Sequence, residues 1–154
     1  MKSKKKMENN YKSKLFKIKT FIFDVDGVLT DGKVIVTTEG EMYRALDTKD
    51  GYAMKYAMIK GFKIAIISGG TNEGIRNRFY ALGVKDIYLG AHEKSEAYKE
   101  LVNNYKLKSD EILYVGDDIP DIPLIKKVGV SCCPSDAVTD VKSVVDYVSH
   151  KKGG

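Results

Sequence analysis

Short apolar runs alternate with longer segments of helical period along most of this chain, and glycine or acidic residues mark the junctions. This alternation is typical of a parallel sheet whose connecting helices cover both of its faces. We therefore expect an α/β fold with a doubly wound parallel sheet and a β-hairpin after the first strand. Strands are expected at residues 20–24, 63–67, 87–89, 112–115, 130–132 and 144–148, the hairpin at 34–38 and 42–46, and helices at 50–60, 72–82, 94–105 and 120–128.

The charge of the chain is unevenly distributed. Residues 1–20 contain eight lysines and one glutamate, a net charge of +7, and since the whole chain carries +5 the remainder carries −2. A length of 154 residues with 43% hydrophobic residues suits one globular core. We therefore expect a basic, disordered leader at 1–19 and a single domain at 20–154. Such a leader is usually a solvated tail, and RNA binding by it is the minor alternative.

Membranes and nucleic acids are not expected partners. No window approaches the roughly 18 consecutive apolar residues of a membrane-spanning helix. The basic start leads into polar sequence, unlike a secretory signal. The mildly acidic remainder gives no reason to expect a nucleic-acid interface. We expect a cytoplasmic location.

The chain lacks the ligands for a zinc site. Its two cysteines, Cys132 and Cys133, are adjacent, so a loop-closing disulfide between them is not expected. The only histidines are His92 and His150. Any metal must therefore be held by oxygen ligands.

Polar side chains stand where several expected strands end. Ligands of doubly wound sheets bind beyond the carboxyl ends of the strands, so these residues are candidates for a site. They are Asp24 and Asp26 after the first strand, Ser68 after the second, Lys94 at the helix following the third, and Asp117 and Asp118 after the fourth.

Several carboxylates at one sheet edge repel one another unless a cation lies between them. Mg²⁺ suits such a place because it prefers oxygen ligands and leaves positions for water and phosphate. Ser68 and the glycines after it can donate to a phosphate, and Lys94 adds positive charge. Together these groups favour phosphoryl transfer through an aspartyl-phosphate. Taken singly, each aspartate is more often a helix cap and Lys94 a surface lysine, so only their joint occurrence indicates a site.

Four segments resemble the motifs of the haloacid dehalogenase superfamily of phosphatases. Residues 21–32 (Phe-Ile-Phe-Asp-Val-Asp-Gly-Val-Leu-Thr-Asp-Gly) resemble the first motif, Ser68 the second, Lys94 the third, and residues 116–121 (Gly-Asp-Asp-Ile-Pro-Asp) the fourth. The Asp31-Gly32 extension and residues 47–52 resemble a branch without a cap domain, which includes phosphatases of 3-deoxy-D-manno-octulosonate (KDO) 8-phosphate. The resemblance runs from about Thr20 to the C-terminus and implies a Rossmann-like fold with no cap domain.

The resemblance also implies a role for each motif residue. Asp24 is implied as nucleophile and Mg²⁺ ligand, and Asp117 as a further ligand. Asp26 is implied to protonate the leaving sugar oxygen, to activate water, and to give its backbone carbonyl to the metal. Ser68 and Lys94 are implied to hold the phosphoryl group. The supporting residues are Asp118 and Asp121, and the sugar acid is implied to contact Asp47, Thr48, Lys49, Asp50, Gly51, Lys55, Gly69 and Arg78 in addition to Asp26 and Lys94.

As a whole, the resemblance implies a Mg²⁺-dependent phosphatase that converts KDO 8-phosphate to KDO and phosphate for lipopolysaccharide precursor synthesis. It also implies a homotetramer, with the hairpin in subunit contacts and a neighbour partly covering each active site.

The sequence departs from the branch at two places. Gly70 stands where an arginine is common, so one expected contact to the substrate carboxylate is missing. The family usually continues past a stretch like residues 151–154 into a glycine-rich tail, so we expect either a truncated chain or different turnover.

Three alternatives stay open. The first is a phosphatase of a sialic acid or KDN 9-phosphate with the same site. The second is a signalling receiver domain, which the order of the acidic motifs argues against. The third is a phosphatase-like fold kept only for oligomerisation, which the intact motif residues argue against.

Overall fold

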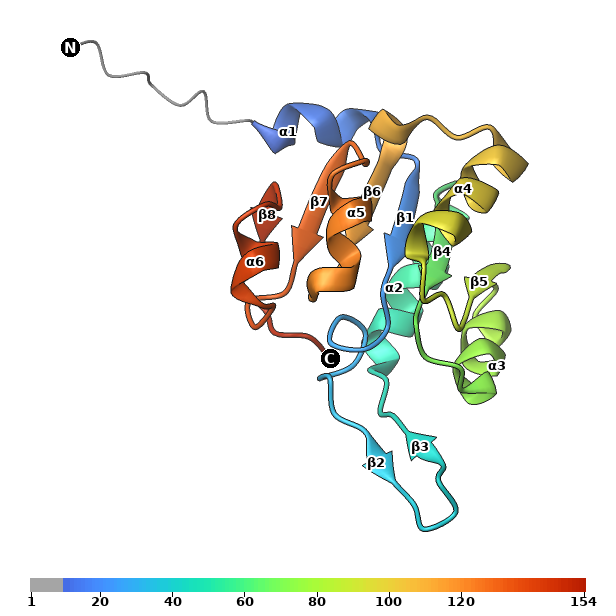
Figure 1. Ribbon diagram of the computed structural model, residues 1–154. Helices are drawn as coiled ribbons and strands as arrows, with labels where there is room; N and C mark the ends of the chain where they lie inside the picture. The colour runs from blue at the N-terminus through green and yellow to red at the C-terminus, as the bar shows by residue number, and fades with distance from the viewer. Residues whose placement is uncertain (1–9) are drawn as a thin grey trace, which may run out of the picture.

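A six-stranded parallel sheet forms the centre of the protein (Figure 1). The computed structural model describes residues 10–154. The strands follow the order β5-β4-β1-β6-β7-β8 across the sheet, so the strand order reverses beside β1, the position where doubly wound sheets bind ligands. The predicted sheet is confirmed, with strands β1 (Thr20–Phe23), β4 (Lys63–Ile67), β5 (Asp86–Tyr88), β6 (Ile112–Val115), β7 (Val130–Cys133) and β8 (Tyr147–Val148).

Helices cover both faces of the sheet. Successive side chains of a strand point to opposite faces, and in β4 Ile64 and Ile66 join one buried cluster while Ala65 and Ile67 join the other. Each large aliphatic side chain that is fully buried contributes about 1.5–3 kcal/mol to stability. The first cluster includes side chains of α2 (Thr48–Ile59) and α3 (Glu73–Ala81), and the second those of α4 (Lys94–Tyr105), α5 (Ile122–Ile125) and α6 (Thr139–Lys142).

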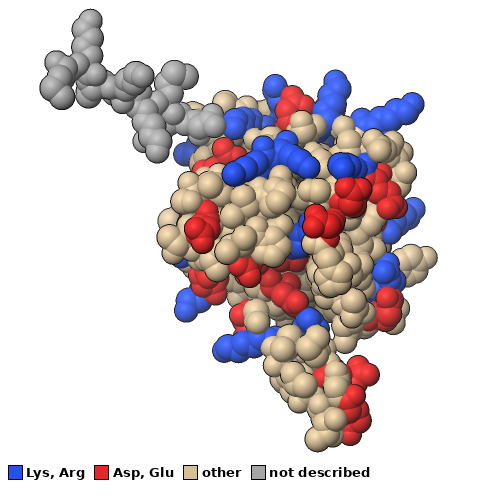
Figure 2. Space-filling model, viewed as in Figure 1, with Lys and Arg blue, Asp and Glu red and all other residues tan. Residues whose placement is uncertain are grey.

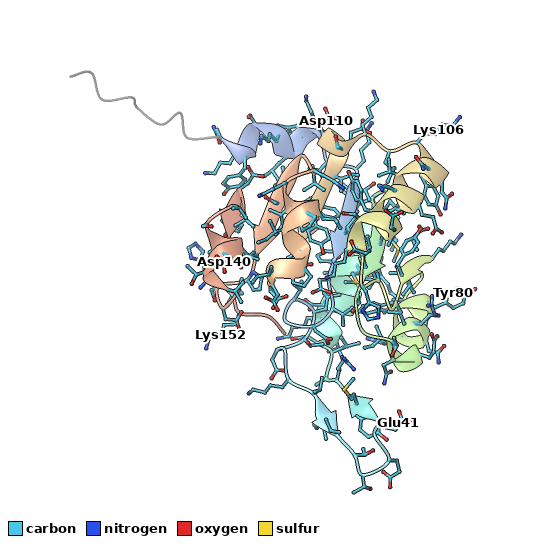
Figure 3. All side chains as sticks on the ribbon, in the orientation of Figure 1. Glu41, Tyr80, Lys106, Asp110, Asp140 and Lys152 are labelled. Carbon is cyan, nitrogen blue, oxygen red and sulfur yellow. The ribbon has the colours of Figure 1, made fainter. Side chains whose placement is uncertain are left out.

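Local sequence sets the limits of the helices. Asp47 caps α2 by accepting a hydrogen bond from Lys49 N at 2.7 Å, and Asn72 caps α3 by accepting one from Gly74 N at 2.8 Å. At the end of α4, Lys106 adopts a left-handed conformation with φ of 52° (Figure 3). Within residues 10–154, no helix combines the length and the hydrophobicity needed to cross a membrane.

The hairpin projects away from the sheet (Figure 1). Its strands β2 (Ile35–Val36) and β3 (Met42–Tyr43) pair antiparallel, which confirms the predicted hairpin with shorter strands. All four strand residues are exposed. On the face shown in Figure 2 the hairpin is largely uncharged, with acidic side chains near its end, where Figure 3 labels Glu41. An exposed apolar element of this kind is typical of a contact surface.

The predicted disordered leader is wrong for its second half, whereas residues 1–9 lie outside the described residues. Helix α1 (Tyr11–Lys14) and the 3-10 helix η1 (Leu15–Lys17) precede the sheet, and Ile18 is buried. Lys19 pairs with Glu111 at 2.6 Å and Lys14 with Asp146 at 3.4 Å. The net charge of the segment did not indicate this order, because Lys14 and Lys19 pair with carboxylates of the domain and Ile18 is buried.

The region after β6 also differs from the expectation. Residues 120–128 do not form one helix, because a 3-10 helix η3 (Ile119–Asp121) comes first and the shorter α5 follows it. Pro120 and Pro123 stand in the first turns of these helices, where a missing N–H costs little. The strand expected at 144–148 is reduced to β8, and α6 precedes it.

Candidate active site

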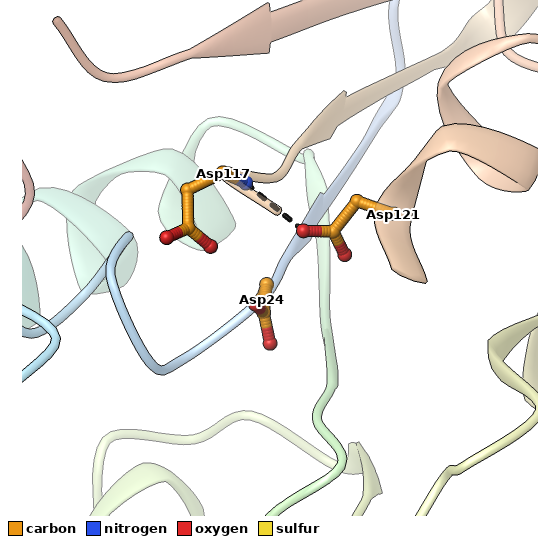
Figure 4. A group of neighbouring side chains, drawn as sticks. All are labelled: Asp24, Asp117 and Asp121. Atoms are coloured by element: carbon orange, nitrogen blue, oxygen red, sulfur yellow. Dashed lines mark hydrogen bonds between the residues drawn. The ribbon is translucent and has the colours of Figure 1, made fainter. Parts of the chain in front are cut away.

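Three aspartates from separate elements lie together beyond the carboxyl ends of the central strands (Figure 4). Asp24 follows β1, Asp117 comes shortly after β6, and Asp121 ends η3. One carboxylate oxygen from each lies within 4.8 Å of those of the other two. The parallel register of β1 and β6 therefore brings together acidic residues that are far apart in the sequence.

Asp121 is fully engaged within the protein. Its side chain is 1% exposed. Oδ1 accepts hydrogen bonds from Lys94 Nζ and the Tyr114 hydroxyl, and Oδ2 accepts from the backbone N–H groups of Asp117 and Asp118, at 2.9 and 3.1 Å. Four donors satisfy about four lone pairs of a carboxylate. Asp121 is therefore a structural anchor rather than a free ligand.

Lys94 is buried between two of these carboxylates. Its Nζ lies 2.6 Å from Asp121 Oδ1 and 3.0 Å from Asp24 Oδ1. Burial alone would lower the pKa of this amine, but the charges of Asp24 and Asp121 raise it above its usual value. Lys94 is therefore held as a cation beside Asp24.

Asp24 and Asp117 have the properties expected of metal ligands. Burial raises the pKa of Asp24 to about 6 against the opposing effect of Lys94. Burial and the charge of Asp24 raise the pKa of Asp117 to about 7. Among the described residues, Asp117 Oδ1 has no hydrogen-bond partner although it is buried. A divalent cation with a preference for oxygen, such as Mg²⁺, fits here because it would supply that partner and the missing positive charge.

Glycines allow the loops to approach these carboxylates. Gly27 has a φ of 83°, and a Cβ added to it would overlap Asp117 Oδ2. A Cβ on Gly153 would in turn overlap the carbonyl oxygen of Gly27. The backbone of residue 153 thus packs on the loop after β1, and that loop packs on Asp117.

The close approach of Gly27 to Asp117 predicts how much stability one added methyl group costs. We expect Gly27→Ala to lose about 2 kcal/mol or more of stability beyond Gly40→Ala, because both alanines must adopt a left-handed conformation and only the first meets a close neighbour. Gly40 has a φ of 84° and nothing within 4 Å of the added Cβ. Urea unfolding of both variants measures the difference, and equal losses would contradict the contact.

Ser68 forms the second side of the site. It follows β4, is 3% exposed, and its Oγ accepts a hydrogen bond from Gly70 N at 3.3 Å. Its carbonyl accepts a hydrogen bond from Ala91 N at 2.9 Å, which ties this turn to the segment after β5. The hydroxyl group can still donate its own hydrogen, so it is available to an oxyanion.

Asp26 is held by a residue that the sequence analysis did not identify. Arg44, which follows β3, donates from Nε to Asp26 Oδ1 at 2.6 Å and from Nη2 to Asp26 Oδ2 at 3.1 Å. Bidentate pairs of this kind are among the stronger polar contacts in proteins. The hairpin therefore reaches the site through a single side chain.

A cavity of about 360 Å³ opens among these groups. The predicted residues in its wall are Asp24, Asp26, Ser68, Gly69, Lys94, Asp117, Asp118 and Asp121. Within residues 10–154, the wall includes none of Asp47, Thr48, Lys49, Asp50, Gly51, Lys55 and Arg78. These seven lie at or near α2 and α3, where the guanidinium of Arg78 approaches Gly51. The single chain thus brings together the predicted catalytic and metal residues, but not most of the predicted sugar contacts.

Two further residues at the site were also missed. His92 lines the cavity, and Tyr114 binds Asp121 from the centre of β6. Tyr114 is expected to be an ordinary core residue because it stands in an apolar run of the sequence. A buried tyrosine hydroxyl generally needs a polar partner, and this need was the signal that could have identified it. Arg44 has no comparable signal, since it is one basic residue in an exposed hairpin.

The comparisons with known proteins agree with this geometry. The description "haloacid dehalogenase-like hydrolase" belongs to a family model that matches residues 85–153. The 3-deoxy-D-manno-octulosonate 8-phosphate phosphatase KdsC of Salmonella typhi is 35% identical over 137 residues, which cover 89% of this chain and 73% of the relative. The chain belongs to the haloacid dehalogenase-like hydrolases.

Solved structures of haloacid dehalogenase-like hydrolases share the fold. A putative hydrolase of subfamily III A from Legionella pneumophila has a TM-score of 0.91 and 37% identity, covering 96% of this chain and 81% of that one. The KDO 8-phosphate phosphatase of Moraxella catarrhalis, solved in complex with a magnesium ion, a phosphate ion and KDO, has a TM-score of 0.90 and 30% identity, covering 95% and 84%. The predicted family and capless fold are confirmed, and the receiver-domain alternative is excluded.

Proposed function

We propose that this hydrolase is a Mg²⁺-dependent phosphatase of KDO 8-phosphate that acts through an aspartyl-phosphate on Asp24. The observation that carries the proposal is the pair of Asp24, whose Oδ1 lies 3.0 Å from the cation Lys94, and Asp117, whose buried Oδ1 has no hydrogen-bond partner among the described residues. The names of the relatives support the substrate, and the magnesium and phosphate ions in the Moraxella catarrhalis enzyme support the cofactor and the chemistry.

Asp24, Asp117 and the backbone carbonyl of Asp26 would hold the metal. Bound there, Mg²⁺ neutralises the carboxylates and the phosphoryl oxygens during phosphoryl transfer. Asp121 is excluded as a ligand by its four hydrogen bonds and instead positions Lys94. Asp118 supports this arrangement, because it caps η3 together with Asp121.

The reaction has two balanced steps. In the first, an oxygen of Asp24 attacks phosphorus, the bond from phosphorus to the sugar oxygen breaks, and Asp26 gives a proton to that oxygen. Lys94 and the Ser68 hydroxyl hold the phosphoryl oxygens meanwhile. In the second, water attacks the aspartyl-phosphate, Asp26 takes a proton from that water, and phosphate and the Asp24 carboxylate are released.

A panel of phosphate esters tests the proposal. Phosphate release with Mg²⁺ is measured from KDO 8-phosphate, sialic acid 9-phosphate, KDN 9-phosphate and neutral sugar phosphates, with and without a chelator. Preferred, Mg²⁺-dependent hydrolysis of KDO 8-phosphate is expected. A preference for a nine-carbon acid would keep the mechanism and replace the substrate, and Gly70 is the observation that favours this second candidate. Lack of hydrolysis across the panel would favour an oligomerisation module.

We also propose a homotetramer, with a neighbour supplying the sugar contacts that the single chain does not bring to its cavity. The exposed apolar hairpin supports subunit contacts. The proposed substrate is a multiply charged phosphate that does not cross membranes unaided, which supports a cytoplasmic location. One hydrolase domain from residue 20 onward, with the preceding helical turns packed against it, remains part of the proposal.

Replacing the hairpin's apolar residues tests the assembly. The double variant Ile35→Asp, Tyr43→Asp is expected to shift the protein from tetramer to smaller species, because these side chains are 70% and 54% exposed and would place charges in an apolar contact. Light scattering after size-exclusion chromatography measures the mass. The exposed Phe16→Asp on η1 is the control outside the hairpin and α2, and an unchanged tetramer in the double variant would contradict the role of the hairpin.

A further inference from the structure

Arg44 is placed to do more than hold Asp26. Its side chain is only 5% exposed, whereas that of Asp26 is 39% exposed. A buried guanidinium beside a partly solvated carboxylate is a costly arrangement if its only task is a surface-type ion pair. The ion pair with Asp26 alone therefore does not account for the burial of this arginine.

The guanidinium has donors to spare. Of its five N–H groups, two bind Asp26 and a third, on Nη1, binds the Met42 carbonyl at 3.1 Å. Two N–H groups remain. Arg44 lines a second cavity of about 330 Å³, which lies between the hairpin and the start of α3.

Gly70 leaves the neighbouring wall without a side chain. A Cβ at this position would lie 3.3 Å from Arg44 Nη2 and 3.6 Å from both Asp26 Oδ2 and Ser68 Oγ. Any larger residue would therefore compete with the guanidinium for this space. Because residue 70 is glycine, Nη2 lies directly behind the part of the main cavity wall that Asp26, Ser68 and Gly70 form.

The cavity needs a cation for a second anionic group. Among the described residues that line the main cavity, Lys94 is the only lysine or arginine. Lys94 already forms ion pairs with Asp24 and Asp121. The planar fork of an arginine binds a carboxylate in a bidentate manner that a lysine cannot reproduce.

Arg44 is also pre-organised. The Met42 carbonyl that accepts its Nη1 hydrogen bond accepts another at 3.1 Å from Asn72 Nδ2, and Asn72 caps α3. The guanidinium is thus braced from the hairpin and from a helix before any ligand binds, which lowers the entropy cost of binding.

We propose that Arg44 is the specificity-determining residue that binds the carboxylate of the sugar-acid substrate, and that Gly70 makes room for it. This inference rests on the proposed function and names how the same site distinguishes acidic from neutral phosphate esters. Arg44 reaches the site from the hairpin, so the carboxylate contact comes from a different segment than an arginine at position 70 would provide.

The test measures kcat/KM for KDO 8-phosphate and for ribose 5-phosphate, which has no carboxylate, and uses their ratio. Arg44→Ala is expected to lower this ratio about 10- to 100-fold, the value of a charge-assisted contact. Arg44→Lys keeps the charge without the fork and should recover only part of it. The double variant Arg44→Ala, Gly70→Arg should recover more than Arg44→Ala, because the guanidinium then reaches the same space from the other side. Arg76→Ala, which removes an ion pair with Glu73 and a hydrogen bond to the Ile87 carbonyl, both made outside the main cavity, is the matched control and should keep the wild-type ratio.

Other results would overturn the inference in distinguishable ways. If Arg44→Ala lowers both kcat/KM values equally, Arg44 only positions Asp26. If the wild type hydrolyses both esters equally well, the phosphatase assignment stands and carboxylate recognition fails. If the wild type hydrolyses neither ester, the proposed function fails and the inference falls with it. Circular dichroism of each variant separates these outcomes from misfolding, and Arg44→Gln serves as a less disruptive truncation if the alanine variant unfolds.

Discussion

The Asp24→Asn protein is expected to release phosphate from KDO 8-phosphate at least about 10⁴-fold more slowly than the wild type, because an amide cannot form the acyl-phosphate bond. The fold should persist, since the amide oxygen can still accept the hydrogen bond from Val25 N and the contact from Lys94 that Oδ1 accepts now. Phosphate release at saturating Mg²⁺ gives the rate, and circular dichroism gives the fold.

Asp140→Asn is the matched control for this loss. Asp140 is exposed on α6 and labelled in Figure 3, so the same chemical change occurs there outside the cavity. We expect its rate to equal that of the wild type. A folded Asp24→Asn protein with a wild-type rate would refute the covalent mechanism.

Asp121→Ala is expected to lower the free energy of unfolding by about 3–5 kcal/mol, the usual cost of removing one partner of a buried charge pair. The change leaves the Tyr114 hydroxyl and two backbone N–H groups without an acceptor and takes one of two carboxylates from Lys94. Loss of the Asp121 charge also reduces the repulsion among the remaining carboxylates. This gain offsets only part of the cost, because burial already raises the pKa values of Asp24 and Asp117 to about 6 and about 7 and so favours their uptake of a proton.

Urea unfolding of the metal-free protein measures this loss. Tyr114→Phe removes a single donor from Asp121 and is expected to cost about 1 kcal/mol. Equal stability losses for the two variants would show that Asp121 is not the centre of the network.

Sequence reasoning predicted which acidic residues lie together at the cavity, because the fold makes strand ends converge. Phe23 of β1 pairs with Val115 of β6, so Asp24 and Asp117 follow the ends of these neighbouring strands by one and two residues. The motif resemblance separated Asp117 from Asp121, and the structure supplies the physical reason: one carboxylate has an unpartnered oxygen and the other has four donors.

Other features depend on contacts that no local pattern encodes. Arg44 reaches Asp26 from an exposed hairpin. The hydrophobic period of a single helix or strand does not indicate a contact of this kind between separate elements. The charge of residues 1–19 predicts a disordered leader, but Lys14 and Lys19 form ion pairs with carboxylates of the domain. The predicted sugar contacts around α2 lie away from the cavity of their own chain, so the role proposed for these residues requires the proposed tetramer.

The packing of Gly153 on Gly27, and of Gly27 on Asp117, has an evolutionary consequence. Under the genetic code, every missense change of a glycine codon introduces a side chain larger than hydrogen. At residue 27 the added side chain would meet the Asp117 carboxylate, which is proposed to bind the metal, and at residue 153 it would meet the backbone of Gly27 that packs on this carboxylate. Selection is therefore expected to remove nearly all missense mutations at residue 153, as it does in a catalytic loop, although residue 153 belongs to none of the four motifs.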